Sequence, residues 1–142
     1  MVENILVPVD DADPAIDALD FAVENYSDAS ITALHVVDPS KFGAAVSIEG
    51  AATYTDVLES HEGNAEKLLA EMSERAAERG VSIETDYVVG DVDRSIVEYI
   101  DEHDIDHVVI GSHGRRGATR ILLGSVAESV TRRSQVPVTV IR

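Results

Sequence analysis

The 142-residue chain is long enough for one domain with a sizeable core, and residues 1–142 are predicted to form a single domain. It contains no cysteine, which excludes disulfides, thiol chemistry and cysteine-ligated zinc. Its 27 acidic and 11 basic residues give a formal net charge of −16, which disfavours nucleic acid and anionic membranes as partners. No apolar stretch approaches the length of a membrane span and no basic leader precedes the first apolar run, so we expect a cytoplasmic protein.

The first part of the chain predicts a strand, a helix and a second strand. Residues 3–9 are almost continuously apolar, as is typical of a buried parallel strand. Asp13 is expected to cap a helix over residues 14–26, whose initial proline suits a first turn. Residues 30–37 predict the second strand.

The middle of the chain predicts a long helix and a third strand. Residues 41–55 are rich in glycine, alanine and serine, and we expect a mobile excursion there. Apolar residues at helical spacing predict a helix over residues 56–79, which Gly80 would end. Residues 81–89 predict the third strand.

The next elements are a helix, a fourth strand and a further helix. Asp91 or Asp93 is expected to cap a helix that ends near residue 103. Residues 108–111 predict a short buried strand, and residues 125–133 a helix.

The chain closes with a fifth predicted strand, residues 136–141. Pro137 lies within it and indicates an edge position, because proline cannot donate to a central ladder. Strands that alternate with helices predict a doubly wound α/β domain, with helices on both faces of one parallel sheet. The ligand site of such a sheet lies beyond the carboxyl ends of its strands, where the strand order reverses.

Positive charge is concentrated near the C-terminus. Residues 1–106 contain five bases and 26 acids, whereas residues 107–142 contain six arginines and one acid. A small polyanion would fit this cationic segment, although some of the arginines could simply lie on the surface. High acid content with only two lysines resembles proteins of a high-salt, halophilic cytoplasm, where screening makes crowded carboxylates tolerable. An ordinary acidic protein is the alternative.

A glycine-rich loop lies inside the cationic segment, between a predicted strand and a predicted helix. Its spacing is Gly111-x2-Gly114-x9-Gly124-Ser125, with three arginines in between. Glycines let the backbone approach a phosphate and adopt positive φ, and the first amides of the following helix would point at an anion. The loop is neither a P-loop nor a dinucleotide fingerprint, because it lacks Gly-Lys-Ser/Thr and the first strand is not followed by G-x-G-x-x-G.

The glycine loop resembles the nucleotide-binding motif of the universal stress protein family, of the adenine nucleotide alpha hydrolase-like superfamily. The likeness extends along the chain, to ILVPVD at 5–10, LHVVD at 34–38, Gly90, and VPVTV at 136–140. It implies a five-stranded parallel sheet of order 3-2-1-4-5. The switch point would then bring Asp10 to the glycine loop, although the two are far apart in sequence.

The resemblance also implies a set of ligand contacts. The adenine and ribose would be lined by Pro8, Asp10 and Val36. The ribose and phosphates would be wrapped by Ile110, Gly111, His113, Gly114 and Arg115. The terminal phosphates would be held by Gly124, Ser125 and Val126. The chain keeps every glycine of the motif and so resembles the ATP-binding type, with ATP, or ADP or AMP, as ligand and Mg²⁺ carried mainly by the phosphates.

Several of these residues have a plainer interpretation. Asp10 could instead cap the next helix, and His113 could be an exposed loop residue. His35 is expected to be a hydrogen-bonded histidine of a central strand. The spacing of the other histidines predicts no protein metal site, and no serine lies in a G-x-S-x-G elbow that would indicate a hydrolase.

We therefore expect a regulatory or stress-response domain that holds adenine nucleotide, without catalytic residues. A slow ATPase or nucleotide-transferring enzyme on the same fold is the main alternative. An interaction dimer with an unused pocket is another. A phospho-receiver domain is disfavoured because no lysine follows Lys67. The family pairs its closing strand with a twin, which implies a homodimer through residues 136–141.

Overall fold

A computed structural model describes residues 2–10, 13–43, 53–112 and 123–142. In chain order the elements are β1 (Asn4–Pro8), α1 (Asp13–Asn25), β2 (Ser30–Val37), the 3₁₀ turn η1 (Pro39–Lys41), α2 (Tyr54–Ala77), β3 (Glu84–Val89), α3 (Val92–Glu102), β4 (His107–Gly111), α4 (Ser125–Arg133) and β5 (Val138–Ile141).

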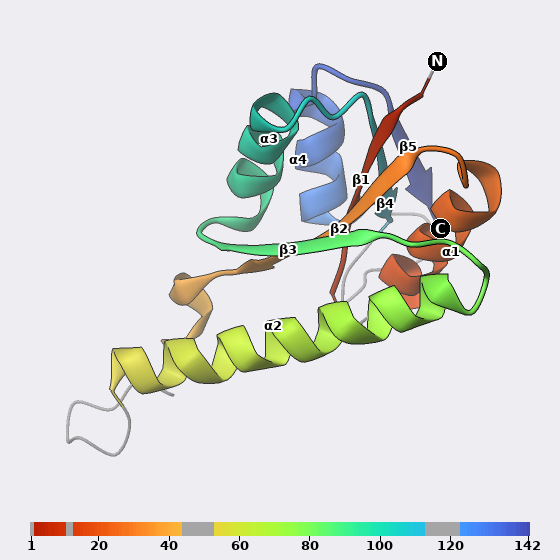
Figure 1. Cartoon of the computed structure of the whole chain (residues 1–142). Coiled ribbons are helices and arrows are strands. Elements are labelled where there is room, and N and C mark those ends of the chain that lie inside the picture. The colour runs from red at the N-terminus through yellow and green to blue at the C-terminus, as the bar shows by residue number, and fades with distance from the viewer. Residues whose placement is uncertain (1, 11–12, 44–52, 113–122) are drawn as a thin grey trace.

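The strands form one five-stranded parallel sheet of order β3-β2-β1-β4-β5, which confirms the predicted topology of a single α/β domain. Helices α1 and α2 cover one face of the sheet, and α3 and α4 cover the other (Figure 1). Pairing of β1 with β2 runs from Asn4 opposite Ser30 to Pro8 opposite Leu34. Pairing of β1 with β4 places Ile5 opposite His107.

Each face of the sheet has its own apolar core, because successive side chains of a strand point to opposite faces. Ile5 and Val7 belong to the cluster that includes Leu19 of α1, whereas Leu6 belongs to the cluster that includes Ile96 of α3. All five of these side chains are at most 1% exposed. Burying one such aliphatic side chain contributes about 1.5–3 kcal/mol, so β1 is anchored from both sides.

Two strands begin two or more residues later than the sequence predicts. β3 begins at Glu84, and the preceding Val81 and Ile83 pack against the core without belonging to the strand. β5 begins at Val138, so Pro137 lies just before the strand and not within it. The Pro137 carbonyl still accepts a hydrogen bond from the Val108 amide at 3.0 Å, which a proline can do although it has no N–H of its own.

Part of the predicted excursion over residues 41–55 is ordered structure. Phe42 is only 5% exposed, and its ring stacks on His61 with 4.6 Å between the ring centroids. Helix α2 begins at Tyr54, two residues earlier than predicted, because Thr53 and Asp56 form a reciprocal capping box. Residues 44–52 lie outside the described part of the chain.

The starts of two other helices differ from the prediction. Helix α1 begins at Asp13, one residue earlier than predicted. Asp91 occupies the N-cap position of α3, but its side chain makes no capping hydrogen bond. Asp93 instead lies in the first turn of α3, where its carboxylate contacts α4.

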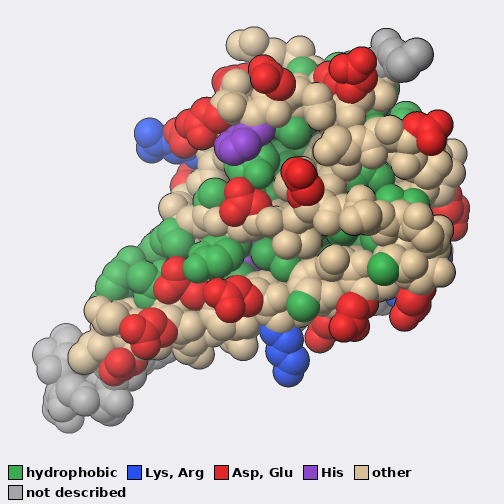
Figure 2. Space-filling model, viewed as in Figure 1, with side chains coloured by type: hydrophobic (Ala, Val, Ile, Leu, Met, Phe, Trp, Pro, Cys, Tyr) green, Lys and Arg blue, Asp and Glu red, His purple; other side chains and the backbone are tan. Residues whose placement is uncertain are grey.

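The surface reflects the acidic composition. Figure 2 shows carboxylates spread over one face of the molecule, with few Lys or Arg side chains among them. On the helical surface Arg75 makes a bidentate pair with Asp20, with both N···O distances at 2.7 Å. This pair ties α2 to α1 and holds the pKa of Asp20 below its ordinary value, mainly through the Arg75 hydrogen bond.

Candidate functional site

The sheet has its switch point between β1 and β4. From β1 the chain passes to α1 on one face, whereas from β4 it reaches α4 on the opposite face. Connections that diverge in this way leave a crevice beyond the carboxyl ends of the two strands, which is where ligands bind in open α/β sheets. The predicted site residues of β1 and β4 therefore lie together at the edge of the sheet formed by the carboxyl ends of the strands.

A close backbone contact brings the two connections together at this edge. A methyl group built on Gly111, the last residue of β4, would come within 2.7 Å of the carbonyl carbon of Pro14 in the first turn of α1. Asp10 lies four residues before Pro14 and is half-buried. The start of α1 is thus packed directly on the end of β4, a few residues after Asp10.

The glycines do not provide the backbone conformation that the sequence suggested. Gly43 and Gly80 are the glycines with positive φ among those described, and Gly124 has φ −63° and ψ 156°. Gly111 is needed because Pro14 leaves no room for a side chain. The expectation of positive φ is therefore wrong for Gly111 and Gly124. The close approach at Gly111 is to the backbone of Pro14, and the expected approach to a phosphate stays a prediction.

The start of α4 is held beside the end of β4. The Ser112 amide donates to the Ile141 carbonyl at 2.7 Å, and the Gly124 amide donates to the Ser112 carbonyl at 2.5 Å. Gly124 is the N-cap of α4, and a glycine offers no side-chain acceptor to the first amides of the helix. In α2, by contrast, the Thr53 hydroxyl accepts from the Asp56 amide at 3.1 Å. The N-terminus of α4 therefore has the composition of an anion site.

The structure places the remaining predicted residues as follows. Pro8 is the buried last residue of β1. The side chains of Val36, Ile110 and Val126 pack in or against the core between the sheet and α3–α4. Ile110 is buried, whereas Val36 and Val126 remain partly exposed. The loop residues His113, Gly114 and Arg115 lie outside the described part of the chain.

The prediction for His35 is confirmed. This residue lies on β2, which is paired with β1 on one side and β3 on the other. Its Nδ1 atom is 2.8 Å from the Val9 carbonyl oxygen. A carbonyl oxygen only accepts, so Nδ1 carries the proton and donates this hydrogen bond.

A side-chain contact between α3 and α4 escaped the sequence reasoning. The Ser129 hydroxyl donates to the Asp93 carboxylate at 2.6 Å, and Arg133 approaches the same carboxylate at 3.5 Å. The Ser129 hydrogen bond lowers the pKa of Asp93, and the neighbouring Asp93 carboxylate raises the pKa of Asp91. Asp93 and Ser129 are separated by 36 positions, and no sequence motif links them.

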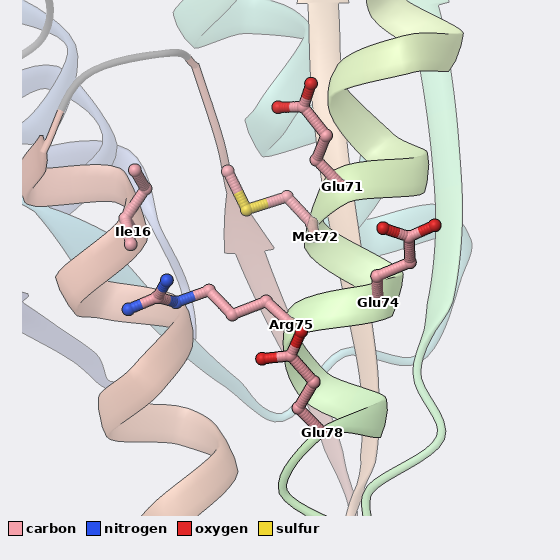
Figure 3. Close-up of a pocket in the computed structure, with 6 residues that line it drawn as sticks. All are labelled: Ile16, Glu71, Met72, Glu74, Arg75 and Glu78. Atoms are coloured by element: carbon pink, nitrogen blue, oxygen red, sulfur yellow. The ribbon is translucent and has the colours of Figure 1, made fainter.

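A shallow groove between α1 and α2 is a separate feature (Figure 3). Its lining side chains are Ile16, Glu71, Met72, Glu74, Arg75 and Glu78. Three glutamates would repel an anion, and Arg75 is already paired with Asp20. This groove therefore does not fit a phosphate compound.

The described residues contain neither a candidate metal site nor a helix able to span a membrane. Residues 2–10, 13–43, 53–112 and 123–142 contain no group of three or more His, Cys, Asp or Glu side chains arranged to hold a metal ion. None of the described helices combines the length and apolar character needed to cross a membrane.

Comparison with known proteins identifies the family. The model of the universal stress protein family matches residues 1–142. Universal stress protein MJ0531 of Methanocaldococcus jannaschii is 33% identical over 144 residues, with 100% of this chain and 83% of that protein covered. Universal stress protein UspA from Lactobacillus plantarum superposes with a TM-score of 0.86 at 28% identity, covering 99% of this chain and 98% of that chain. A universal stress protein crystallised in complex with cAMP gives a TM-score of 0.74 at 28% identity, covering 99% and 97% of the two chains. The chain belongs to the universal stress protein family.

Proposed function

We propose that this protein is an ATP-binding, cytoplasmic regulatory domain that holds adenine nucleotide at the β1/β4 switch point. The observation that carries the proposal is the packing of Gly111 on Pro14, which places the start of α1, four residues after Asp10, against the end of β4. In the proposed site, the Asp10 carboxylate accepts hydrogen bonds from the ribose. The backbone of Gly111 and of residues 124–126 faces the phosphates. A family relative that binds cAMP supports an adenine nucleotide as ligand.

Electrostatics favour phosphates at this edge. The loop between β4 and α4 contains three of the chain's 11 basic residues in an otherwise strongly acidic protein. The N-terminus of α4 adds the partial positive charge of a helix dipole. Mg²⁺ would be carried mainly by the phosphates, since the described residues offer no carboxylate cluster to hold it.

The direct test is calorimetry with Mg-ATP on protein stripped of nucleotide, in concentrated KCl. The Asp10→Ala variant should bind ATP more weakly. Asp28→Ala is its matched control, because it removes the same charge from an exposed position that precedes β2, at the opposite edge of the sheet. Failure of the stripped wild-type protein to bind ATP, ADP and AMP would refute the proposal.

The nucleotide is expected to be held and not rapidly consumed, because no water-activating base is evident among the described residues beside the phosphate loop. Turnover is measured as phosphate or pyrophosphate release under saturating Mg-ATP. Release well above that of a Gly114→Val variant would instead favour the alternative, a slow ATPase or nucleotide-transferring enzyme.

The proposal includes a homodimer formed through the C-terminal edge strand, residues 136–141. β5 is the last strand of the sheet order and pairs with β4 on one side. An apolar edge strand invites pairing with another chain unless it is covered, which supports a twin strand as the occupant. Light scattering at high salt should give twice the monomer mass. A monomer at every concentration would contradict this part of the proposal.

A further inference from the structure

We propose that His35 is a positioning residue for nucleotide recognition: its imidazole sets the orientation of the Val9–Asp10 peptide and thereby aims Asp10 at the ribose. The inference rests on the proposed nucleotide-binding function and goes beyond it, because His35 itself does not contact the ligand.

The ladder between β1 and β2 ends at Leu34, the residue before His35. The paired positions stop at Pro8 opposite Leu34, and the Val9 amide still donates to the Leu34 carbonyl at 2.8 Å. β2 continues to Val37 in register with β3, whereas β1 turns away toward α1. At this point of separation the His35 side chain donates from Nδ1 to the Val9 carbonyl oxygen, at 2.8 Å.

The peptide bond between Val9 and Asp10 is planar. The Val9 carbonyl oxygen and the Asp10 amide belong to the same rigid unit, with the Asp10 Cα at its end. A hydrogen bond that holds the oxygen therefore fixes the plane from which the Asp10 side chain projects. Val9 itself is anchored, with only 6% of its surface exposed, so the orientation of this peptide passes directly to Asp10.

The position of the donor atom Nδ1 within the His35 side chain can be reproduced by one substitution and not by another. Nδ1 lies one bond from Cγ, so the reach of the side chain is short and well defined. An asparagine at position 35 has an amide nitrogen at the same distance from Cγ and can replace Nδ1. A glutamine has its amide one bond farther from the backbone and cannot adopt the same geometry. His35→Asn and His35→Gln are therefore a matched pair. Both variants lose the imidazole ring, but only His35→Asn keeps the hydrogen bond to the Val9 carbonyl.

The test measures affinities for ATP, 2′-deoxy-ATP and 3′-deoxy-ATP by calorimetry on stripped wild-type, His35→Asn and His35→Gln proteins. We expect His35→Gln to bind ATP about fivefold more weakly, the value of one lost neutral hydrogen bond. The deoxynucleotide that lacks the hydroxyl recognised by Asp10 should bind the wild type and His35→Gln equally. His35→Asn should retain wild-type affinity for all three nucleotides.

A double-mutant cycle with Asp10→Ala provides the second measurement. If His35 acts through Asp10, the double variant Asp10→Ala/His35→Gln should bind ATP as well as Asp10→Ala alone. This comparison remains informative where His35→Gln also lowers stability, and thermal unfolding of each variant shows how much protein is folded.

The outcomes separate this inference from the proposed function. If the wild type binds no nucleotide, the proposed function fails, and this inference fails with it. If the wild type binds ATP and both deoxynucleotides equally, or if His35→Gln weakens all three to the same extent, only the positioning role is overturned. An unchanged affinity of His35→Gln for ATP would also overturn it.

Discussion

Replacing Gly111 with alanine should destabilise the protein even when no nucleotide is present. The added methyl group would lie 2.7 Å from the Pro14 carbonyl carbon and 2.8 Å from both the Pro14 oxygen and Cβ. Normal contacts between nonbonded carbon atoms are about 3.5–4.0 Å, so the methyl group is too close to three atoms at once. Two of them are backbone atoms, so relief requires that the start of α1 move. Overpacking of this kind costs about 1–3 kcal/mol, and we expect Gly111→Ala to lower the free energy of unfolding by about 2 kcal/mol.

Two other glycines provide controls of the same chemical change. Gly63 lies on the exposed side of α2, and a methyl group built there meets nothing within 4 Å. Gly63→Ala should therefore stabilise the protein by about 0.5–1 kcal/mol, through reduced backbone entropy of the unfolded chain. A methyl group on Gly90 would meet only the Ser95 Oγ atom, at 2.7 Å, and a side chain can rotate away. Gly90→Ala should fall between the other two variants.

The assay is urea unfolding of stripped protein at constant high salt, with the free energy of unfolding obtained by linear extrapolation. The midpoint of thermal unfolding should fall by roughly 4–8 °C for Gly111→Ala, at 2–4 °C per kcal/mol for a chain of this size. A free energy of unfolding equal to that of the wild type would refute the steric argument. It would then follow that Gly111 matters only for the approach of a ligand.

Three further predictions concern titration and salt. Burial lowers the pKa of His107 below its ordinary value of 6.5, so the folded state favours the neutral ring, and the unfolded chain takes up the proton first as pH falls. The free energy of unfolding should therefore decrease below about pH 6.5, and a His107→Gln variant whose curve has the wild-type slope in that range would contradict this assignment. Ser129→Ala should raise the pKa of Asp93, measured by NMR titration, and reduce stability by about 1–2 kcal/mol, because the hydrogen bond to the carboxylate is lost. An unchanged titration of Asp93 would show that Ser129 is not its main partner. Stability should also rise as KCl increases from about 0.1 M to 1 M, because the Debye length shrinks from about 10 Å to 3 Å and the excess of carboxylates is screened. Stability that is flat or that falls over this range would count against the halophilic interpretation.

Local patterns identified the elements well because their causes are local. The apolar run that becomes β1 and the periodic apolar residues that become α2 depend on near neighbours and on burial. The same local chemistry contained a signal that the prediction missed: Thr53 and Asp56 have the spacing of a capping box and set the start of α2. Pro137 correctly indicated the edge position of β5 but lies outside the strand, because the start of a strand depends on its partner's register.

The candidate site was only partly accessible from sequence. The glycine spacing and the family resemblance indicated which segments meet, and the sheet order confirms that β1 and β4 are neighbours. Where the side chains of the predicted site residues pack could not be predicted. The side chains of Val36, Ile110 and Val126 pack with the core between the sheet and α3–α4. The Asp93–Ser129 contact also depends on how α3 and α4 are docked together.

The sequence by itself determined the alternation of strands and helices, the parallel sheet and the cationic glycine loop, because composition and hydrophobic period act over a few residues. Only the tertiary structure decided why Gly111 is a glycine and what His35 holds. Pro14 excludes a side chain at Gly111, and the Val9 carbonyl accepts the imidazole proton of His35. Both contacts join residues that are distant in sequence, and the packing of helices on strands sets their distances. Steric exclusion and hydrogen-bond geometry are decided by a few tenths of an ångström, which no residue pattern encodes.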